Sequence, residues 1–213
     1  MSEIKVNKIS PATGTETTLG DASDKFIVPS GAELEVASGA TIANSGTATG
    51  FGGGGKILQV VQLQMTGYLT TTSTSEVDMT GYTKAITPTA ASSKILVCLN
   101  YHMSGGLTYG NWTTVYRDIE GAGYNKIAMG DSASARTRGT FVGYFSSAAH
   151  IRTFDLMWLD EPSYTLTDVI TYKTKWCQKE SGGTYTINGD MTNTDSVNRT
   201  REASTITLWE IGA

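Results

Sequence analysis

The sequence predicts an all-β protein, and three observations favour that fold class. Thr, Val, Ile and Tyr occur in short runs separated by Gly, Ser and Asn, as in strands joined by turns. The 213 residues include 24 Gly but only 4 Pro, and the charged fraction of 17% lies below the usual quarter. Amphipathic helical spacing does not persist through any long window. We therefore expect short strands and turns along most of the chain.

Residues 1–49 are predicted to be an attachment and stalk segment with short β-repeats. The motif SGA at residues 30–32 recurs at 38–40, and the apolar residues Val28, Leu34, Val36 and Ile42 lie around these turns. Large apolar side chains are too sparse here to offset the entropy lost on folding. Strands from copies of the same chain would have to cover them, most simply as a homotrimer about one axis. A flexible polar leader is the alternative.

Residues 50–55 are predicted to be a glycine-rich hinge. The stretch GFGGGGKI fits a phosphate-binding loop up to Lys56, but Ile57 stands where a Mg²⁺-binding hydroxyl is required. No buried strand is expected before it. Four consecutive glycines indicate instead a loose connection between two ordered parts.

Residues 56–213 are predicted to form a jelly-roll-like antiparallel β-sandwich, the head of the protein. The expected strands lie near residues 56–65, 75–87, 94–103, 112–119, 124–130, 136–146, 151–160, 167–177, 183–188 and 203–211. So many short strands in a domain of this size favour two packed sheets. The apolar run KILVCL at 94–99 is expected to be central.

Several phrases together resemble short tail-fibre proteins of marine bacteriophages, notably those that infect cyanobacteria. The phrases are SEIKVNKISPATGTETTLGD, the VPSGA…VASGATI repeat, GGGGKILQVVQ, ITPTAASSKILV, AMGDSASARTRGTF, SGGTYTINGD and STITLWEI. The resemblance covers nearly the whole chain and contains no catalytic motif. It implies a homotrimeric fibre of the virion, made in the host cytoplasm. Its N-terminal segment would bind another tail or virion protein, and its distal domain a glycan or protein of the host surface.

Loop positions suggest where the head would bind. Successive loops of an antiparallel sandwich alternate between its ends, which would place loops 66–74, 104–111, 131–135, 161–166 and 189–202 opposite the stalk. Loops 88–93, 120–123, 147–150 and 178–182 would then lie near it. Aromatic rings among short polar side chains suit sugars, although such residues are also common in loops without a binding role. The candidate receptor-binding residues are Tyr68, Tyr109, Asn111, Trp112, Tyr164 and Asn193.

Charge and composition disfavour several function classes. The net charge is −4 with a pI near 5.2, and no long basic run suggests nucleic-acid binding. No apolar stretch is long enough to span a bilayer, and MSEIKVNKIS lacks the apolar core of a signal peptide. Cys98 and Cys177 lack metal-ligand spacing with His102 and His150, so we expect no metal and no cofactor. A disulfide between the two cysteines is left open.

We expect no enzymatic activity. The sequence GDS at 130–132 resembles the start of an esterase signature, but Ala133 replaces the required Leu, and Ser147 replaces the Asp expected before His150. The acidic pairs are Asp118 with Glu120, Asp160 with Glu161, and Asp190 with Asp195. Their spacing does not suggest two carboxyl groups that face each other across a groove. A capsid decoration or tail adaptor protein is the alternative to a tail fibre, and a polysaccharide depolymerase is less favoured.

Overall fold

The computed structural model describes residues 14, 25, 27–33, 35–38, 40, 56–105, 110–179 and 183–212. The chain divides into two units, Met1–Gly52 and Gly53–Ala213. In the first unit, the N–H groups of Ala32 and Ala40 donate to the carbonyls of Pro29 and Ala37, each at 3.0 Å. Both SGA motifs therefore form tight turns. The described residues of this unit form no strand, and Leu34 and Ile42 lie outside them.

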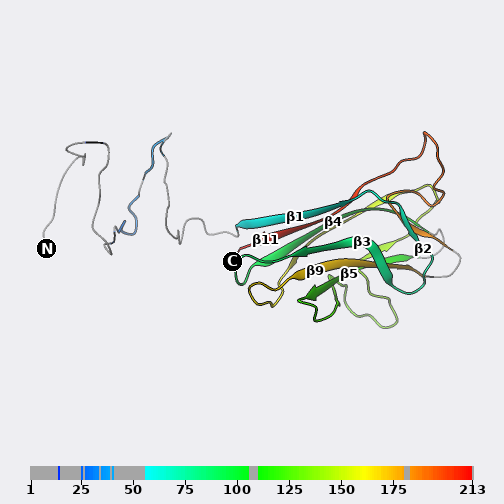
Figure 1. The fold of residues 1–213 in the computed structure, drawn as a ribbon, viewed down its shortest axis with the longest axis horizontal. Helices are drawn as coiled ribbons and strands as arrows, with labels where there is room; N and C mark the ends of the chain where they lie inside the picture. The colour runs from blue at the N-terminus through cyan, green and yellow to red at the C-terminus, as the bar shows by residue number, and fades with distance from the viewer. Residues whose placement is uncertain are drawn as a thin grey trace. The chain divides into compact units, whose positions relative to one another are not determined.

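The second unit is an all-β sandwich of two antiparallel sheets, which we call sheets A and B (Figure 1). Sheet A contains β1 (Ile57–Met65), β2 (Leu69–Thr71), β4 (Lys94–Ser104), β8 (Arg152–Asp160), β10 (Tyr185–Ile187) and β11 (Ser204–Ile211). Sheet B contains β3 (Val77–Ile86), β5 (Asn111–Ile119), β6 (Asn125–Ile127), β7 (Phe141–Gly143) and β9 (Ile170–Gln178). Within the described ranges, no helix is long and apolar enough to cross a membrane.

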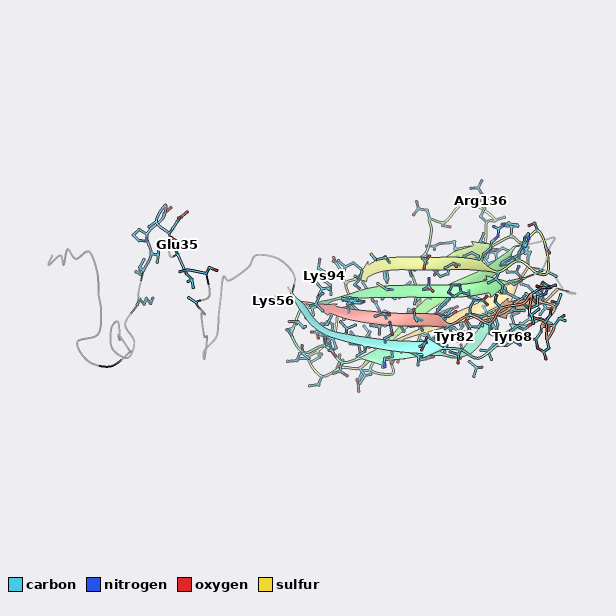
Figure 2. All side chains as sticks on the ribbon, turned by 90° about the horizontal axis from the view of Figure 1, so that it is seen from above. Glu35, Lys56, Tyr68, Tyr82, Lys94 and Arg136 are labelled. Carbon is cyan, nitrogen blue, oxygen red and sulfur yellow. The ribbon has the colours of Figure 1, made fainter. Side chains whose placement is uncertain are left out.

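The strand order places β4 at the centre of sheet A, as its apolar run predicts. The long strands follow the order β1-β11-β4-β8, while the short β10 pairs with the end of β4 and carries β2. In sheet B the order is β3-β9-β5, and β6 and β7 both pair with the other edge of β5. Figure 2 looks onto sheet A, whose four long strands lie side by side.

The core lies between the sheets because alternate residues of each strand point inward. In β4 these residues are Ile95, Val97, Leu99, Tyr101 and Met103, which are 0–3% exposed. Their partners in sheet B include Tyr82, Ile86, Val115, Ile170, Tyr172 and Trp176. Tyr82 and Tyr101 meet edge to face, with ring centroids 5.4 Å apart. Each buried side chain of this size contributes about 1.5–3 kcal/mol to the free energy of unfolding.

The two ends of the sandwich carry different connecting loops. The N–H of Gly212 donates to the carbonyl of Lys56 at 2.7 Å, so the chain enters and leaves this unit at one end. We call this the entry end, and the opposite one the far end. Residues 87–93, 120–124 and 161–169 lie at the entry end. Residues 66–68, 72–76, 144–151 and 188–203 lie at the far end, where the β4–β5 and β9–β10 connections also leave their strands.

Part of the expected loop assignment is therefore wrong. Because β6 and β7 run in the same direction along β5, they form one interrupted strand with an excursion at 128–140, not two opposed strands. The strands β8 and β9 consequently run opposite to the expectation, whereas β11 runs as expected. Loop 161–166 lies at the entry end, loop 147–150 lies at the far end, and residues 131–135 belong to the excursion. The expectation that loop 178–182 lies near the stalk is also wrong, because Gln178 and Lys179 lie at the far end. Since β10 is too short to cross the sheet, loop 189–202 still lies at the far end, as predicted.

Candidate functional site

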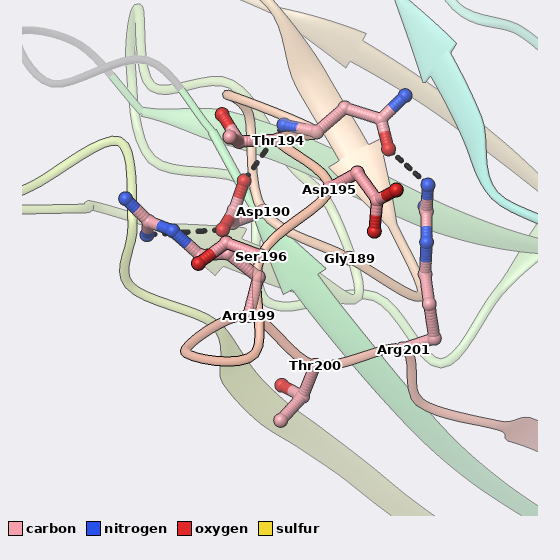
Figure 3. A pocket seen from close by; sticks show the side chains of 9 residues that line it. Gly189, Asp190, Thr194, Asp195, Ser196, Arg199, Thr200 and Arg201 are labelled. Carbon is pink, nitrogen blue, oxygen red and sulfur yellow. Dashed lines mark hydrogen bonds and ion pairs between the residues drawn. The ribbon is translucent and has the colours of Figure 1, made fainter.

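Loop 188–203 encloses a polar hollow of about 250 Å³ at the far end of the sandwich (Figure 3). Its lining residues are Gly189, Asp190, Asn193, Thr194, Asp195, Ser196, Arg199, Thr200 and Arg201. All of them belong to the connection from β10 to β11. A hollow formed by one loop needs internal contacts to keep its shape, and two groups of contacts supply them.

Asp190 organises the inside of this loop. One carboxylate oxygen accepts hydrogen bonds from the N–H of Thr192 at 2.8 Å, its hydroxyl at 2.6 Å and the N–H of Asn193 at 2.8 Å. The other pairs with Arg199 at 3.0 Å. Burial alone would raise the pKa of Asp190, but these donors outweigh it and hold the pKa below its usual value. Asp190 is therefore an ionised structural anchor.

A second group joins the hollow to the loop that follows β1. The guanidinium carbon of Arg201 lies 4.3 Å from the ring centroid of Tyr68, and Arg201 also donates to the side-chain oxygen of Asn193. The hydroxyl of Tyr68 donates to the carbonyl of Asp190 at 3.1 Å. A Cβ at Gly189 would lie 2.9 Å from both Arg201 and Tyr68. Only glycine lets the backbone approach this closely.

Asn188 fixes the start of the loop to the sandwich. Its amide nitrogen donates to the carbonyls of Met65 and Gly67 and to the hydroxyl of Tyr82, over 2.8–3.0 Å. Its amide oxygen accepts a hydrogen bond from Ser204 at 2.6 Å. The residue is fully buried and has a φ of 61°. The loop therefore begins from a rigid point, which favours a preformed hollow.

A second, more apolar hollow of about 410 Å³ lies at the edge of sheet B. Trp112 on β5, Tyr144 after β7 and Arg136 in the excursion line it. Tyr144 is 59% exposed, and the ammonium of Lys179 lies 5.7 Å from the ring centroid of Trp112. Aromatic faces next to cationic groups can stack on a sugar ring and pair with an acidic substituent.

The structure brings together some of the sequence-predicted binding residues and separates others. Tyr68 and Asn193 meet at the far-end hollow, and Trp112 lines the second hollow. Asn111 is only 1% exposed, so its side chain is removed from the candidate set. Tyr164 donates to the carbonyl of Ala90 at 2.7 Å, which places it at the entry end, so the expectation of a far-end position is wrong. Tyr109 lies outside the described residues.

Sequence reasoning missed the residues that shape both hollows. Asp190, Arg199 and Arg201 hold the far-end loop, and Tyr144 contributes the exposed ring of the second hollow. A usable signal was present, since two arginines and three acidic residues stand in this one loop. Their pairing depends on a chain reversal within the loop, which residue spacing does not specify.

In each acidic pair considered for sugar cleavage, at least one side chain has structural partners. Asp160 binds Arg117 at 2.5 Å and Tyr172 at 2.7 Å inside the sandwich. Asp118 accepts hydrogen bonds from the N–H groups of Gly121 and Gly123 in the following turn. Asp190 is engaged by Thr192, Asn193 and Arg199, so one acid of each predicted pair has a structural role.

Other reactive side chains lie outside the two hollows. Ser146 lies 2.9 Å from the ring of His150 on the exposed 144–151 loop. Cys98 and Cys177 are both free and lie in different sheets. Among the residues that the structure describes, no three His, Cys, Asp or Glu side chains gather as metal ligands.

Comparison with known proteins assigns no family to this chain. No family model and no curated protein sequence matches the chain. The features available for a functional conclusion are the rigid sandwich and its two hollows.

Proposed function

We propose that this protein is a bacteriophage tail-fibre-like protein that attaches the virion to the surface of its host cell. The observation that carries this proposal is the far-end hollow, in which Asp190, Arg199, Tyr68 and Arg201 hold a loop in shape. A preformed polar hollow at the tip of a rigid sandwich, opposite the point where the chain enters, is a good arrangement for recognition. The resemblance to marine phage fibres gives the same assignment.

The proposed ligand is a surface glycan. Arg199 and Arg201 carry charge at the hollow, while Asn193, Thr194 and Ser196 provide short polar groups. Such groups match the hydroxyl and acidic substituents of sugars. A shallow site of this kind binds weakly by itself, so useful attachment requires several sites that act together.

A homotrimer supplies that multiplicity. Residues 1–49 would form a stalk from three chains and anchor it on another virion protein, and residues 50–55 would be the hinge to the head. The strand orders β1-β11-β4-β8 and β3-β9-β5-β6 support jelly-roll connectivity for each head. Three linked heads raise the effective concentration of each site once one head is bound.

Adsorption of the purified full-length protein to marine cyanobacterial cells tests the proposal. We expect saturable binding that the double variant Arg199→Ala/Arg201→Ala reduces at least tenfold. The matched double variant Lys56→Ala/Lys84→Ala, with both changes outside the far-end loops, should bind as the unmodified protein does. Equal adsorption of the two variants would place binding elsewhere. New reducing ends in host polysaccharide would instead identify a depolymerase.

A further inference from the structure

One row of apolar side chains crosses all four long strands on the outer face of sheet A. The strand registers pair Val60 with Trp209, Trp209 with Leu96, and Leu96 with Leu159. The inward positions of the same strands fill the core, so this row points away from it. Val60 is 47% exposed and Leu159 is 42% exposed.

The next outward row toward the far end is mixed. It contains Gln62, Thr207, Cys98 and Met157 in register, and Met157 is 78% exposed. The row after that is polar throughout and contains Gln64, Thr205, Asn100 and Asp155. We call Val60, Leu96, Cys98, Met157, Leu159 and Trp209 the apolar strip. The registers confine it to the half of the face nearest the entry end. Figure 2 shows the four strands of this face, with the labelled Lys94 at the entry end of β4.

A flat apolar strip on a sheet is unfavourable in water unless something covers it. Neighbouring strands lie about 4.8 Å apart and outward rows about 7 Å apart, so the strip, one full row and half of the next, covers roughly 200 Å². That area is about a quarter of the roughly 800 Å² that each partner buries in a stable interface of ordinary size. The strip can therefore supply the centre of an interface between chains that are already held together.

The surroundings of the strip suit another copy better than a lipid surface. Lys94 and Glu161 border it as an ion pair of 2.6 Å, with 44% and 65% of their side chains exposed. A surface that carries both charge signs can pair reciprocally with its own copy. Asp155 and Glu161 would repel the anionic lipids that favour interfacial binding. The chain also enters β1 at Ile57, at the end of the face nearest the strip and soon after the segment proposed to associate.

We infer that the apolar strip on the outer face of sheet A is the surface through which the heads of neighbouring copies of this chain pack together. The inference deepens the assembly part of the proposed function and rests on it. Copies joined through residues 1–49 would turn their strips toward a common axis near the entry end. The polar half of each face would then remain in water, and the far-end hollows would remain accessible.

The test uses the full-length chain with charges placed in the strip. In the double variant Val60→Lys/Met157→Lys, both substitutions replace exposed side chains, so each single head should still fold. Val77→Lys is the matched control, because Val77 is an exposed strand valine on sheet B at 38% exposure. We expect the trimer of the strip variant to dissociate at a protein concentration at least tenfold higher than the trimer of the control does. Sedimentation equilibrium measures this dissociation as a fall in the average mass.

The native thiol of Cys98 provides a second readout, because Cys98 lies within the strip while Cys177 is buried in the other sheet. We expect iodoacetamide at pH 9 to modify Cys98 at least tenfold more slowly in the assembled protein than in the strip variant. Equal dissociation and equal modification of the strip variant and the control would overturn the inference. A monomeric unmodified protein with a protected Cys98 would also overturn it, since a segment of the same chain would then cover the strip.

Failure of this inference and failure of the proposed function can be distinguished. A protein that assembles through the strip but does not adsorb to cells supports the inference and contradicts attachment. Adsorption that depends on Arg199 and Arg201, without any effect of the strip variant on mass, supports attachment and contradicts the inference.

Discussion

Arg201 lies over the ring of Tyr68, with its guanidinium carbon 4.3 Å from the ring centroid. This contact joins the loop after β1 to the loop before β11, two segments that are far apart in sequence. A stacked guanidinium keeps donors on its edge, and one of them already binds Asn193. The stacking therefore orients a cation at the hollow without consuming all of its hydrogen-bonding capacity.

Arg201→Lys should weaken adsorption to cells about 5- to 30-fold, which corresponds to roughly 1–2 kcal/mol of lost stacking and donor geometry. The charge is retained, so a purely electrostatic role predicts little change. Binding isotherms on whole cells measure the effect, and thermal melting should remain within a few degrees. Arg138→Lys, in the excursion at 128–140, is the matched control. Equal affinity for all three proteins would contradict the assigned role.

Asn188→Ala should lower the free energy of unfolding by about 3 kcal/mol, because it leaves buried partners of Asn188 without hydrogen bonds. Asn188→Gly loses the same bonds but tolerates the φ of 61°, so it should be less destabilising than the alanine variant by about 1 kcal/mol. Urea denaturation of both variants measures the two contributions separately. A loss below 1 kcal/mol for Asn188→Ala would show that the network is not required.

Acid stability should depend on Glu210, which is fully buried at the entry end. Burial alone would raise the pKa of Glu210, but hydrogen bonds from Gln59, Thr89 and Ala90 outweigh it and lower the pKa below the usual 4.5. A carboxylate with a lowered folded-state pKa stabilises the protein above its unfolded-state pKa. That stabilisation is lost as the pH falls below about 4.5 and through the folded-state pKa.

Glu210→Gln should therefore be less stable than the unmodified protein at pH 7, by about 2 kcal/mol, with a smaller difference at pH 3. Free energies of unfolding measured by urea denaturation between pH 3 and pH 7 give the comparison. Glu161→Gln, at an exposed position of the same end, should show no such convergence. A pH-independent difference for Glu210→Gln would contradict the lowered pKa.

The second hollow should contribute to recognition of acidic sugars through Trp112 and Tyr144. Trp112→Ala and Tyr144→Ala should each reduce binding to an immobilised uronic-acid polymer by about 5- to 30-fold, as expected for the loss of one stacking ring. Tyr124→Ala is the control, because Tyr124 is 40% exposed and belongs to an entry-end turn. Surface plasmon resonance gives the affinities. Equal losses in all three variants would mean that the hollow is not a binding site.

The fold class and most strands could be predicted because alternation and composition are local properties of the sequence. The central position of β4 follows from its apolar run, and each other long strand lies within two or three residues of its expected range. The short β2 is not predicted, because LTT stands in a threonine-rich stretch in which apolar and polar residues do not alternate. A strand pattern also carries no direction, so the sequence predicts β6 and β7 as opposed strands and places loops 147–150, 161–166 and 178–182 at the wrong ends.

The candidate site was less predictable because it depends on contacts between distant residues. Tyr68 and Asn193 could be named as exposed loop residues, but nothing local specifies that Arg201 joins them. Asn111 and Tyr164 also stand in or next to polar loops of the sequence. In the structure, however, Asn111 is buried and Tyr164 donates to a backbone carbonyl at the entry end. Chemical type alone does not distinguish a ligand contact from a structural contact.

The pairing of Lys56 with Gly212 would have a mechanical consequence in the attachment proposed above. β1 pairs with β11 in antiparallel register from Ile57 to Met65, so a pull on Lys56 away from the far end acts along the strand. The interstrand hydrogen bonds lie perpendicular to that pull and bear it together, in shear, instead of opening one after another. The tether would thus be strongest in the direction in which drag on a bound virion loads it.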